Sequence, residues 1–176
     1  SHDQIESKLL ILCFNSDGTL DSSFGQNGRI IKSIGGVWDE AVSVEILDDG
    51  KILIAGLTHN SLDIDIFLTR YLFNGNIDED FGNGGVSILN IINETDDFVT
   101  DIEIQNDNKI LLSGYITKEK DPSCNCLRNN SEYKSLLVIR LNSNGSFDSS
   151  FGSNGWVKPD INKTNVVATS IEIQED

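Results

Sequence analysis

One sequence pattern occurs three times in this chain of 176 residues. In each copy a glycine is followed three positions later by an aspartate, and that aspartate is followed three positions later by Phe-Gly. The copies lie at residues 17–25, 75–82 and 144–152. A second pattern, an alternation of the type Ser-Val-Glu-Ile, keeps step with the first at residues 43–47, 101–105 and 170–174. Self-similarity at a fixed period of about 58 residues predicts an array of small structural units.

The second interval between copies is longer than the first by about twelve residues. The additional residues fall between Thr117 and Lys134, where the sequence is polar and contains Pro122. Insertions into repeats usually map to loops. The chain is therefore expected to carry one exposed loop near residues 117–134.

Within one unit the residue pattern favours β-strands. Apolar and polar residues alternate over residues 41–47, Asp48-Asp49-Gly50 is typical of a hairpin turn, and β-branched or aromatic residues dominate the segments that follow. Four strands are predicted per unit, at residues 41–47, 51–55 and 66–72 and at 29–32 or its counterpart 86–89.

Four antiparallel strands form a sheet too small to cover its own faces, so neighbouring units must stack, as propeller blades do. The predicted fold class is all-β, a β-propeller-like array of four-stranded antiparallel blades. The chain offers two strands, two full sets of four, and one opening strand at residues 170–174, or about 2.7 blades at this period. The ring is incomplete unless several copies assemble.

Residues 1–7 are interpreted as a leader or tag remnant and residues 8–176 as the repeat segment. Because the chain contains no methionine, we expect it to be processed or cut from a longer chain.

The charge of the chain restricts its partners. Lysine and arginine number 13 and the acids 28, which gives a net charge of −15 at pH 7. Such a chain repels phosphate backbones and anionic lipid surfaces. No apolar run approaches the roughly 20 residues that a membrane helix needs. We therefore expect neither nucleic acid binding nor membrane insertion.

A phenylalanine recurs once per unit, at positions 24, 81 and 151, and each stands directly before a glycine. A residue repeated in every unit is most simply explained by packing between blades, with the glycine adopting a positive φ. A row of aromatic rings that binds sugar or peptide is the alternative.

The turns of the repeats are rich in oxygen ligands. Carboxylate and amide side chains occur there at short alternate spacing, which is compatible with calcium. The same residue types also form turns by accepting backbone hydrogen bonds. We expect no cofactor, with calcium as the alternative at two groups: Asn15, Asp17 and Asp21, and Asn74, Asn76, Asp78 and Asp80.

Residues with catalytic potential are few. His2 lies in the leader and His59 in a predicted loop, and neither has a partner at diagnostic spacing. Two carboxylate pairs, Asp63 with Asp65 and Asp78 with Asp80, would point to one side of an extended chain and could serve as acid and base. With 28 acids in the chain, coincidence explains them better. We therefore predict no catalytic, cofactor-binding or metal-binding residue.

The three cysteines leave the compartment undecided, because they are too few for a disulfide scaffold. Cys13 stands alone. Cys124 and Cys126 lie in the insertion, where they could form a crosslink, stay as free thiols or help to hold a soft metal.

The repeat resembles a known family. Asp-Gly-Thr-Leu-Asp-Ser-Ser-Phe-Gly at residues 17–25, followed by Asp-Asp-Gly-Lys-Ile-Leu-Ile-Ala-Gly at residues 48–56, is similar to the delta-60 repeat family, a β-propeller domain of unknown function in bacterial proteins. The resemblance covers about residues 8–176. Arg70-Tyr71 fits the strand ending of that family, whereas Cys13-Phe14 lacks the arginine. The resemblance implies a propeller fold in large secreted or surface-exposed bacterial proteins, and it implies no reaction.

Three hypotheses for function follow. The first is a non-catalytic propeller module that binds protein or glycan, or serves as a spacer, with the loop at residues 117–134 as a contact surface. The second is a propeller lyase or hydrolase with acids from several blades at the central channel. The third is a structural unit that completes its ring through other copies, because an unpaired sheet edge is adhesive.

Overall fold

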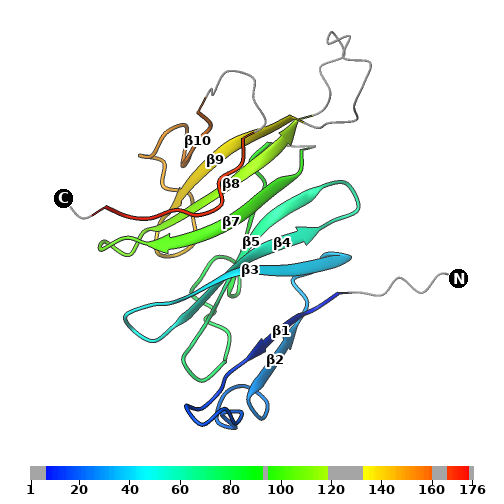
Figure 1. Cartoon of the computed structure of the whole chain (residues 1–176), viewed down its shortest axis with the longest axis vertical. Helices are drawn as coiled ribbons and strands as arrows, with labels where there is room; N and C mark the ends of the chain where they lie inside the picture. The colour runs from blue at the N-terminus through cyan, green and yellow to red at the C-terminus, as the bar shows by residue number, and fades with distance from the viewer. Residues whose placement is uncertain (1–6, 93–94, 119–132, 160–165, 175–176) are drawn as a thin grey trace, which may run out of the picture.

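The computed structural model describes residues 7–92, 95–118, 133–159 and 166–174 (Figure 1). All regular structure in these ranges is β, and no helix there is long and apolar enough to cross a membrane. Ten strands are present in these ranges: β1 (Leu9–Leu12), β2 (Arg29–Lys32), β3 (Trp38–Ile46), β4 (Ile52–His59), β5 (Ile64–Tyr71), β6 (Val86–Leu89), β7 (Asp97–Ile104), β8 (Ile110–Lys118), β9 (Tyr133–Leu141) and β10 (Trp156–Val157).

The strands form three antiparallel sheets, which we call blades 1, 2 and 3. Blade 1 contains β1 and β2, blade 2 has the order β3-β4-β5-β6, and blade 3 has the order β7-β8-β9-β10. Each four-stranded blade is a simple meander, and the three blades follow one another along the molecule without closing into a ring (Figure 1). The predicted fold class is confirmed.

Blades 2 and 3 share the same irregularity. The pairing register shifts between Ala41 and Ser43 on β3 and between Val99 and Asp101 on β7. Beside each shift lies a glycine, Gly56 on β4 or Gly114 on β8, where a Cβ atom would meet backbone oxygen at 2.1 or 1.9 Å. These glycines let the first two strands of a blade approach closely at the bulge.

The hydrophobic core lies between the blades. The larger cluster joins blades 2 and 3 and includes Leu53, Leu68 and Phe81 of blade 2 with Ile102 and Leu137 of blade 3. The smaller cluster joins blades 1 and 2 through four buried residues: Leu9, Ile54, Phe67 and Tyr71. Blade 2 thus buries one face against blade 1 and the other against blade 3, which is the stacking expected of thin sheets.

The strand predicted at residues 170–174 does not form. These residues run beside β7, where the Ile171 amide donates to the Asp101 carboxylate at 3.2 Å (Figure 1). The Val166 amide donates to the Lys134 carbonyl at 3.2 Å. A strand needs a hydrogen-bonded ladder with a neighbour, and no other described segment supplies one.

The loop is shorter than the predicted range of residues 117–134, because β8 continues to Lys118 and β9 begins at Tyr133. Its centre, with Cys124 and Cys126, lies outside the described residues, as does His2. His59 ends β4 instead of lying in a loop, and its carbonyl accepts a hydrogen bond from the Val37 amide at 2.8 Å.

Candidate functional site

Phe81 of the second repeat lies in the core between blades 2 and 3, as predicted. Phe24 and Phe81 are buried, while Phe151 at the outer side of blade 3 is half-buried. The glycines after them, Gly25, Gly82 and Gly152, have φ near +54° in all three copies. At φ > 0 a side chain is strained, so the turn requires glycine there.

Arg70, near the end of β5, contacts both an aspartate and one of these phenylalanines. The Nε atom of Arg70 donates to Asp78 Oδ2 at 2.7 Å, and its guanidinium lies 4.7 Å from the centre of the Phe81 ring. Its Nη1 atom donates to the carbonyl of Ser143 in blade 3 at 2.6 Å. Arg70 therefore joins an ion pair, a cation–π contact and a hydrogen bond between blades. We call this arrangement the clasp.

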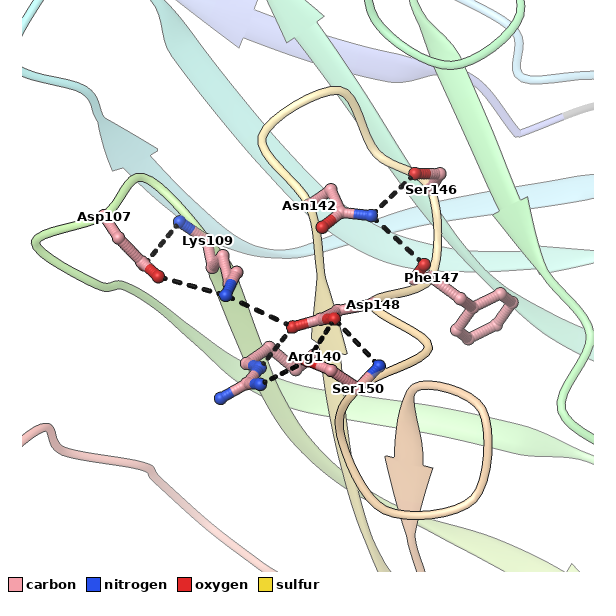
Figure 2. Close-up of polar contacts among 8 residues, drawn as sticks. All are labelled: Asp107, Lys109, Arg140, Asn142, Ser146, Phe147, Asp148 and Ser150. Atoms are coloured by element: carbon pink, nitrogen blue, oxygen red, sulfur yellow. Dashed lines mark hydrogen bonds and ion pairs between the residues drawn. The ribbon is translucent and has the colours of Figure 1, made fainter.

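The same side chains recur in blade 3. Arg140 donates to Asp148 Oδ2 at 2.8 Å and stacks over Phe151 at 4.7 Å. Figure 2 shows Arg140 and Ser150 around the Asp148 carboxylate, with Lys109 approaching the same oxygen at 3.5 Å. Lys51 approaches Asp78 in the same way at 3.4 Å in blade 2. In blade 1 the arginine position is taken by Cys13, which is half-buried.

Hydrogen bonds and neighbouring positive charges lower the pKa of both aspartates. Burial alone would raise the pKa of Asp78, but hydrogen bonding to Arg70 and the positive charges of Arg70 and Lys51 outweigh it and lower that pKa. The pKa of Asp148 is held well below its usual range, chiefly by the hydroxyl and amide of Ser150 and further by Arg140.

The oxygens considered for calcium bond to protein donors. Asp17 accepts the Thr19 amide at 2.9 Å and its hydroxyl at 2.6 Å, and Asp21 accepts the same two groups of Ser23. Asn74 accepts the Asn76 amide at 3.0 Å. These contacts are those of turn residues that cap their own backbone.

The remaining calcium candidates lie on the same turns. Asn15 donates to Thr19 and Leu20, and Asp80 donates its amide to Asp78 at 3.3 Å. Among the described residues no three His, Cys, Asp or Glu side chains are placed to hold one metal ion.

The two predicted carboxylate pairs have different geometries. Asp78 and Asp80 lie in a turn, where Asp78 faces Arg70 and Asp80 is exposed. Asp63 and Asp65 are both buried and accept hydrogen bonds from the single amide nitrogen of Asn60, at 2.5 and 2.9 Å. Burial and the charge of Asp63 raise the pKa of Asp65.

Acids of different blades meet at the first strands. β3 and β7 are neighbours, and the Ser43 hydroxyl lies 3.4 Å from Asp101 Oδ1. The pKa of Glu45 is raised by partial burial and by the negative charges of Glu103 and Asp101. These residues lie on the strands that would face the central channel of a propeller.

A cleft of about 460 Å³ lies between the turns of blades 2 and 3. The β3–β4 turn forms one wall, Arg70 and Ile110 line its interior, and turn residues of blade 3 form the other wall. Its lining comprises Leu47, Asp48, Asp49, Lys51, Arg70, Asn108, Ile110, Ser143 and Asn144. The volume is within the range of small-ligand sites. Seven of the nine lining residues have polar side chains, and none is aromatic.

Sequence reasoning did not predict the clasp or the cleft. The signals were present, because an arginine ends the third strand of two units and a lysine follows two acidic turns, Asp48-Asp49-Gly50 and Asp107-Asn108. What the sequence did not show is that these cations converge on the repeated aspartate of the next turn.

A family model described as a domain of unknown function (DUF5122) β-propeller matches residues 5–24, 47–81 and 133–151. Each matched segment ends on the phenylalanine of the repeat. The match supports a β-propeller repeat family for this chain. The narrower delta-60 name stays a prediction. A search of curated proteins finds no match.

Proposed function

We propose that this chain is a non-catalytic propeller module of a secreted or surface bacterial protein that binds a protein segment or a glycan. The observation that supports binding is the cleft between blades 2 and 3, with its polar lining and accessible rim. Its cations already have partners, since Lys51 and Arg70 both contact Asp78. Because these charged groups already bond to each other, they hold the cleft rigid. A rigid cleft favours binding of a ligand over catalysis of a reaction.

The exposed carboxylate of Asp48 is the group of the cleft best placed to meet a ligand, because Asp49 already bonds to Lys51 and Asn144 Oδ1 accepts from Ser146. Asp48 and Asp49 lie on the rim, and the Asn144 side chain lies opposite. Carboxylate and amide oxygens accept hydrogen bonds from sugar hydroxyls or from the amide and basic groups of a peptide. The absence of an aromatic platform in the lining favours a ligand held by polar contacts.

Binding is tested with printed arrays of glycans and of peptides of mixed charge. We expect a ligand whose affinity falls at least tenfold in Asp48→Lys, which reverses one rim charge, because a lost polar contact of this kind is worth about 1.4 kcal/mol or more. Glu79→Lys, an exposed change outside the cleft, is the matched control and should bind normally. Array ligands that bind both variants equally would contradict the proposal, as would arrays without any ligand.

The second candidate is a propeller lyase or hydrolase, favoured by the proximity of Glu45, Asp101 and Glu103. A carboxylic acid with a raised pKa beside two further acids is an arrangement suited to general acid–base catalysis. Turnover of polysaccharide or peptide substrates that is lost in Glu45→Gln and kept in Asp48→Lys would establish this function in place of the first.

A further inference from the structure

Five asparagines of this chain stand directly before a glycine, at positions 27, 74, 83, 144 and 154. Asparagine is chemically labile, and most so in this dipeptide, because the backbone nitrogen of the next residue can attack the side-chain carbonyl carbon. Glycine carries no Cβ atom that would hinder the approach. The attack also needs a backbone nitrogen that is free to move and can give up its proton. The structure therefore decides which of the five pairs reacts.

Four of the five glycine amides already donate hydrogen bonds within their own turns. The donors and their carbonyl acceptors are Gly28 with Phe24 at 2.8 Å, Gly75 with Leu72 at 2.8 Å, Gly145 with Asn142 at 2.9 Å and Gly155 with Phe151 at 2.7 Å. A nitrogen held in this way must break its bond before it can attack, so the local structure has to open first. Two of the asparagine side chains are held as well, because Asn74 Oδ1 and Asn144 Oδ1 each accept a backbone amide.

The exception is the pair Asn83-Gly84, in the turn between β5 and β6. Neither the Gly84 amide nor the Asn83 side chain has a hydrogen-bond partner among the residues that the structure describes. Both residues are exposed, and a Cβ atom on Gly84 would meet nothing within 4 Å. The attacking nitrogen, the carbon that it attacks and the surrounding water are therefore all accessible to one another.

The position of this pair within its turn explains the difference. Residues 82–85 form the same turn as residues 25–28, with equivalent hydrogen bonds. In both turns the last glycine closes the turn by donating its amide at 2.8 Å to the carbonyl of the repeated phenylalanine. In the first repeat the asparagine directly precedes that closing glycine. Asn83 lies one position earlier and precedes Gly84, whose amide takes no part in the bonds of the turn.

We propose that Asn83-Gly84 is a site of spontaneous modification, at which Asn83 is converted to aspartate and isoaspartate. The Gly84 nitrogen forms a bond to Asn83 Cγ and the Cγ–Nδ2 bond breaks. The side-chain nitrogen leaves as ammonia with the proton that the Gly84 nitrogen gives up. Water then opens the cyclic imide. Cleavage between Cγ and the Gly84 nitrogen gives aspartate, and cleavage between the main-chain carbonyl carbon of residue 83 and that nitrogen gives isoaspartate.

Both products change the surface of blade 2. Each adds one negative charge to a chain whose net charge is already −15. Isoaspartate also directs the main chain through the side-chain carbons, which lengthens the backbone between Asn83 and Gly84 by one atom. The Asn83 amide donates to the Val86 carbonyl at 2.7 Å, where β6 begins, and this bond depends on the length of the turn. Isoaspartate is the group that protein isoaspartyl methyltransferases recognise, so this class of enzyme would act on the modified chain.

The test is incubation of the whole folded chain at mildly alkaline pH, followed by proteolysis and mass spectrometry of the peptides that contain the five pairs. We expect Asn83 to be converted at least about tenfold faster than the other four asparagines, because their glycine amides must first be released from hydrogen bonds. Transfer of a labelled methyl group by an isoaspartyl methyltransferase identifies the isoaspartate. In denaturant the five pairs should react at similar rates, because each asparagine is followed by the same residue.

The other repeats supply matched variants that the turn accommodates. Asn83→Gln introduces the residue of the equivalent position 26, and its longer side chain should abolish conversion, because it closes the ring far more slowly. Gly84→Asn introduces the residue of positions 27 and 154, which have φ of +54° and +57° against +59° at Gly84. Its side chain shields the nitrogen, so conversion at Asn83 should fall to the rate of the four bonded pairs.

Four outcomes would each overturn the proposal. They are the absence of conversion at Asn83, equal conversion at another pair of the folded chain, an unchanged rate at Asn83 in Gly84→Asn, and a preference for Asn83 that persists in denaturant. Circular dichroism of both variants checks that they are folded as the wild type is.

Discussion

Arg70 and Arg140 occupy equivalent positions but have different surroundings. Arg70 makes the complete clasp, with a side chain 10% exposed, whereas Arg140 has no bond to a following blade in the described structure and is 21% exposed. The same sequence position therefore contributes differently to stability according to its neighbour. A comparison of the two arginines measures what the contact between blades adds.

Arg70→Ala is expected to lower the free energy of unfolding by about 3 kcal/mol, because it removes two charge-assisted hydrogen bonds, to Asp78 and to the Ser143 carbonyl, while Lys51 stays 3.4 Å from Asp78. Arg140→Ala should cost about 1–2 kcal/mol, because Asp148 keeps the hydroxyl and amide of Ser150. Urea denaturation of the monomeric protein measures both. Equal losses would show that the bond from Arg70 to blade 3 contributes nothing.

Asp97 has an unusual protonation equilibrium. It is fully buried, and burial raises its pKa to about 6 despite hydrogen bonds from the Ile91 amide and Thr95. The folded state therefore holds this proton between about pH 4 and 6, where the unfolded chain has released it. Stability from this group is complete below pH 4 and is lost as pH rises through 6.

Relative to Asp97→Asn, the wild type should lose about 3 kcal/mol of unfolding free energy between pH 4 and pH 7, from a pKa difference of about two units. The comparison with the variant cancels the contributions of Asp78 and Asp148, whose lowered pKa values act in the opposite direction. Chemical denaturation of both proteins at several pH values measures the difference in their free energies of unfolding. A difference that does not change with pH would contradict the raised pKa of Asp97.

The element that joins the blades is the turn after the third strand. Three turns share one hydrogen-bond pattern, seen in the amide-to-carbonyl bonds Asn15–Thr19, Leu72–Asn76 and Asn142–Ser146. The shape of each turn is local, because a glycine with positive φ and an aspartate or asparagine that caps its own backbone suffice to form it. The function of the turn is tertiary, because it inserts beside the Phe-Gly pair of the preceding blade.

Gly145→Ala and Gly18→Ala separate the local from the tertiary contribution. Both replacements introduce the strain of a side chain at φ +85°, about 1 kcal/mol. Only Gly145→Ala also drives a methyl group into the buried Phe81 ring, which should cost about 1–3 kcal/mol more. Thermal unfolding of monomeric protein measures the gap, and equal destabilisation would contradict the packing described.

The whole molecule is an array with unequal junctions. Blades 2 and 3 bury an extensive shared core, while blade 1 has two strands and attaches through the smaller cluster around Leu9. In stacked arrays stability is approximately the sum of units and their interfaces. Blade 1 is therefore the part that opens at the lowest free energy.

Native-state hydrogen exchange should show this order. Paired amides of β1 and β2 are expected to exchange at least tenfold faster than those of β4 and β8, a difference of about 1.4 kcal/mol or more in opening free energy. Uniform protection would contradict an array of unequal junctions.

Much of the architecture follows from local patterns in this sequence. Alternation over residues 41–47, the acidic turn after it and the recurrence of Phe-Gly were sufficient to predict strands, hairpins and stacked blades, because a β-strand and its turns are determined by near neighbours. The prediction was wrong at residues 170–174, since an alternating segment becomes a strand only when a partner supplies its hydrogen bonds. Asp63 and Asp65 were recognised as a pair, but their shared donor Asn60 was not.

The sequence by itself determined the repeat, its period and the residues that each turn requires. Only the tertiary structure decided which charges meet. The Arg70 guanidinium donates to the Ser143 carbonyl across 73 positions of the chain, and Asp97 is removed from water only by its burial in the fold. Burial and pairing are properties of what lies against a residue, and one blade acquires them only when the next is in place.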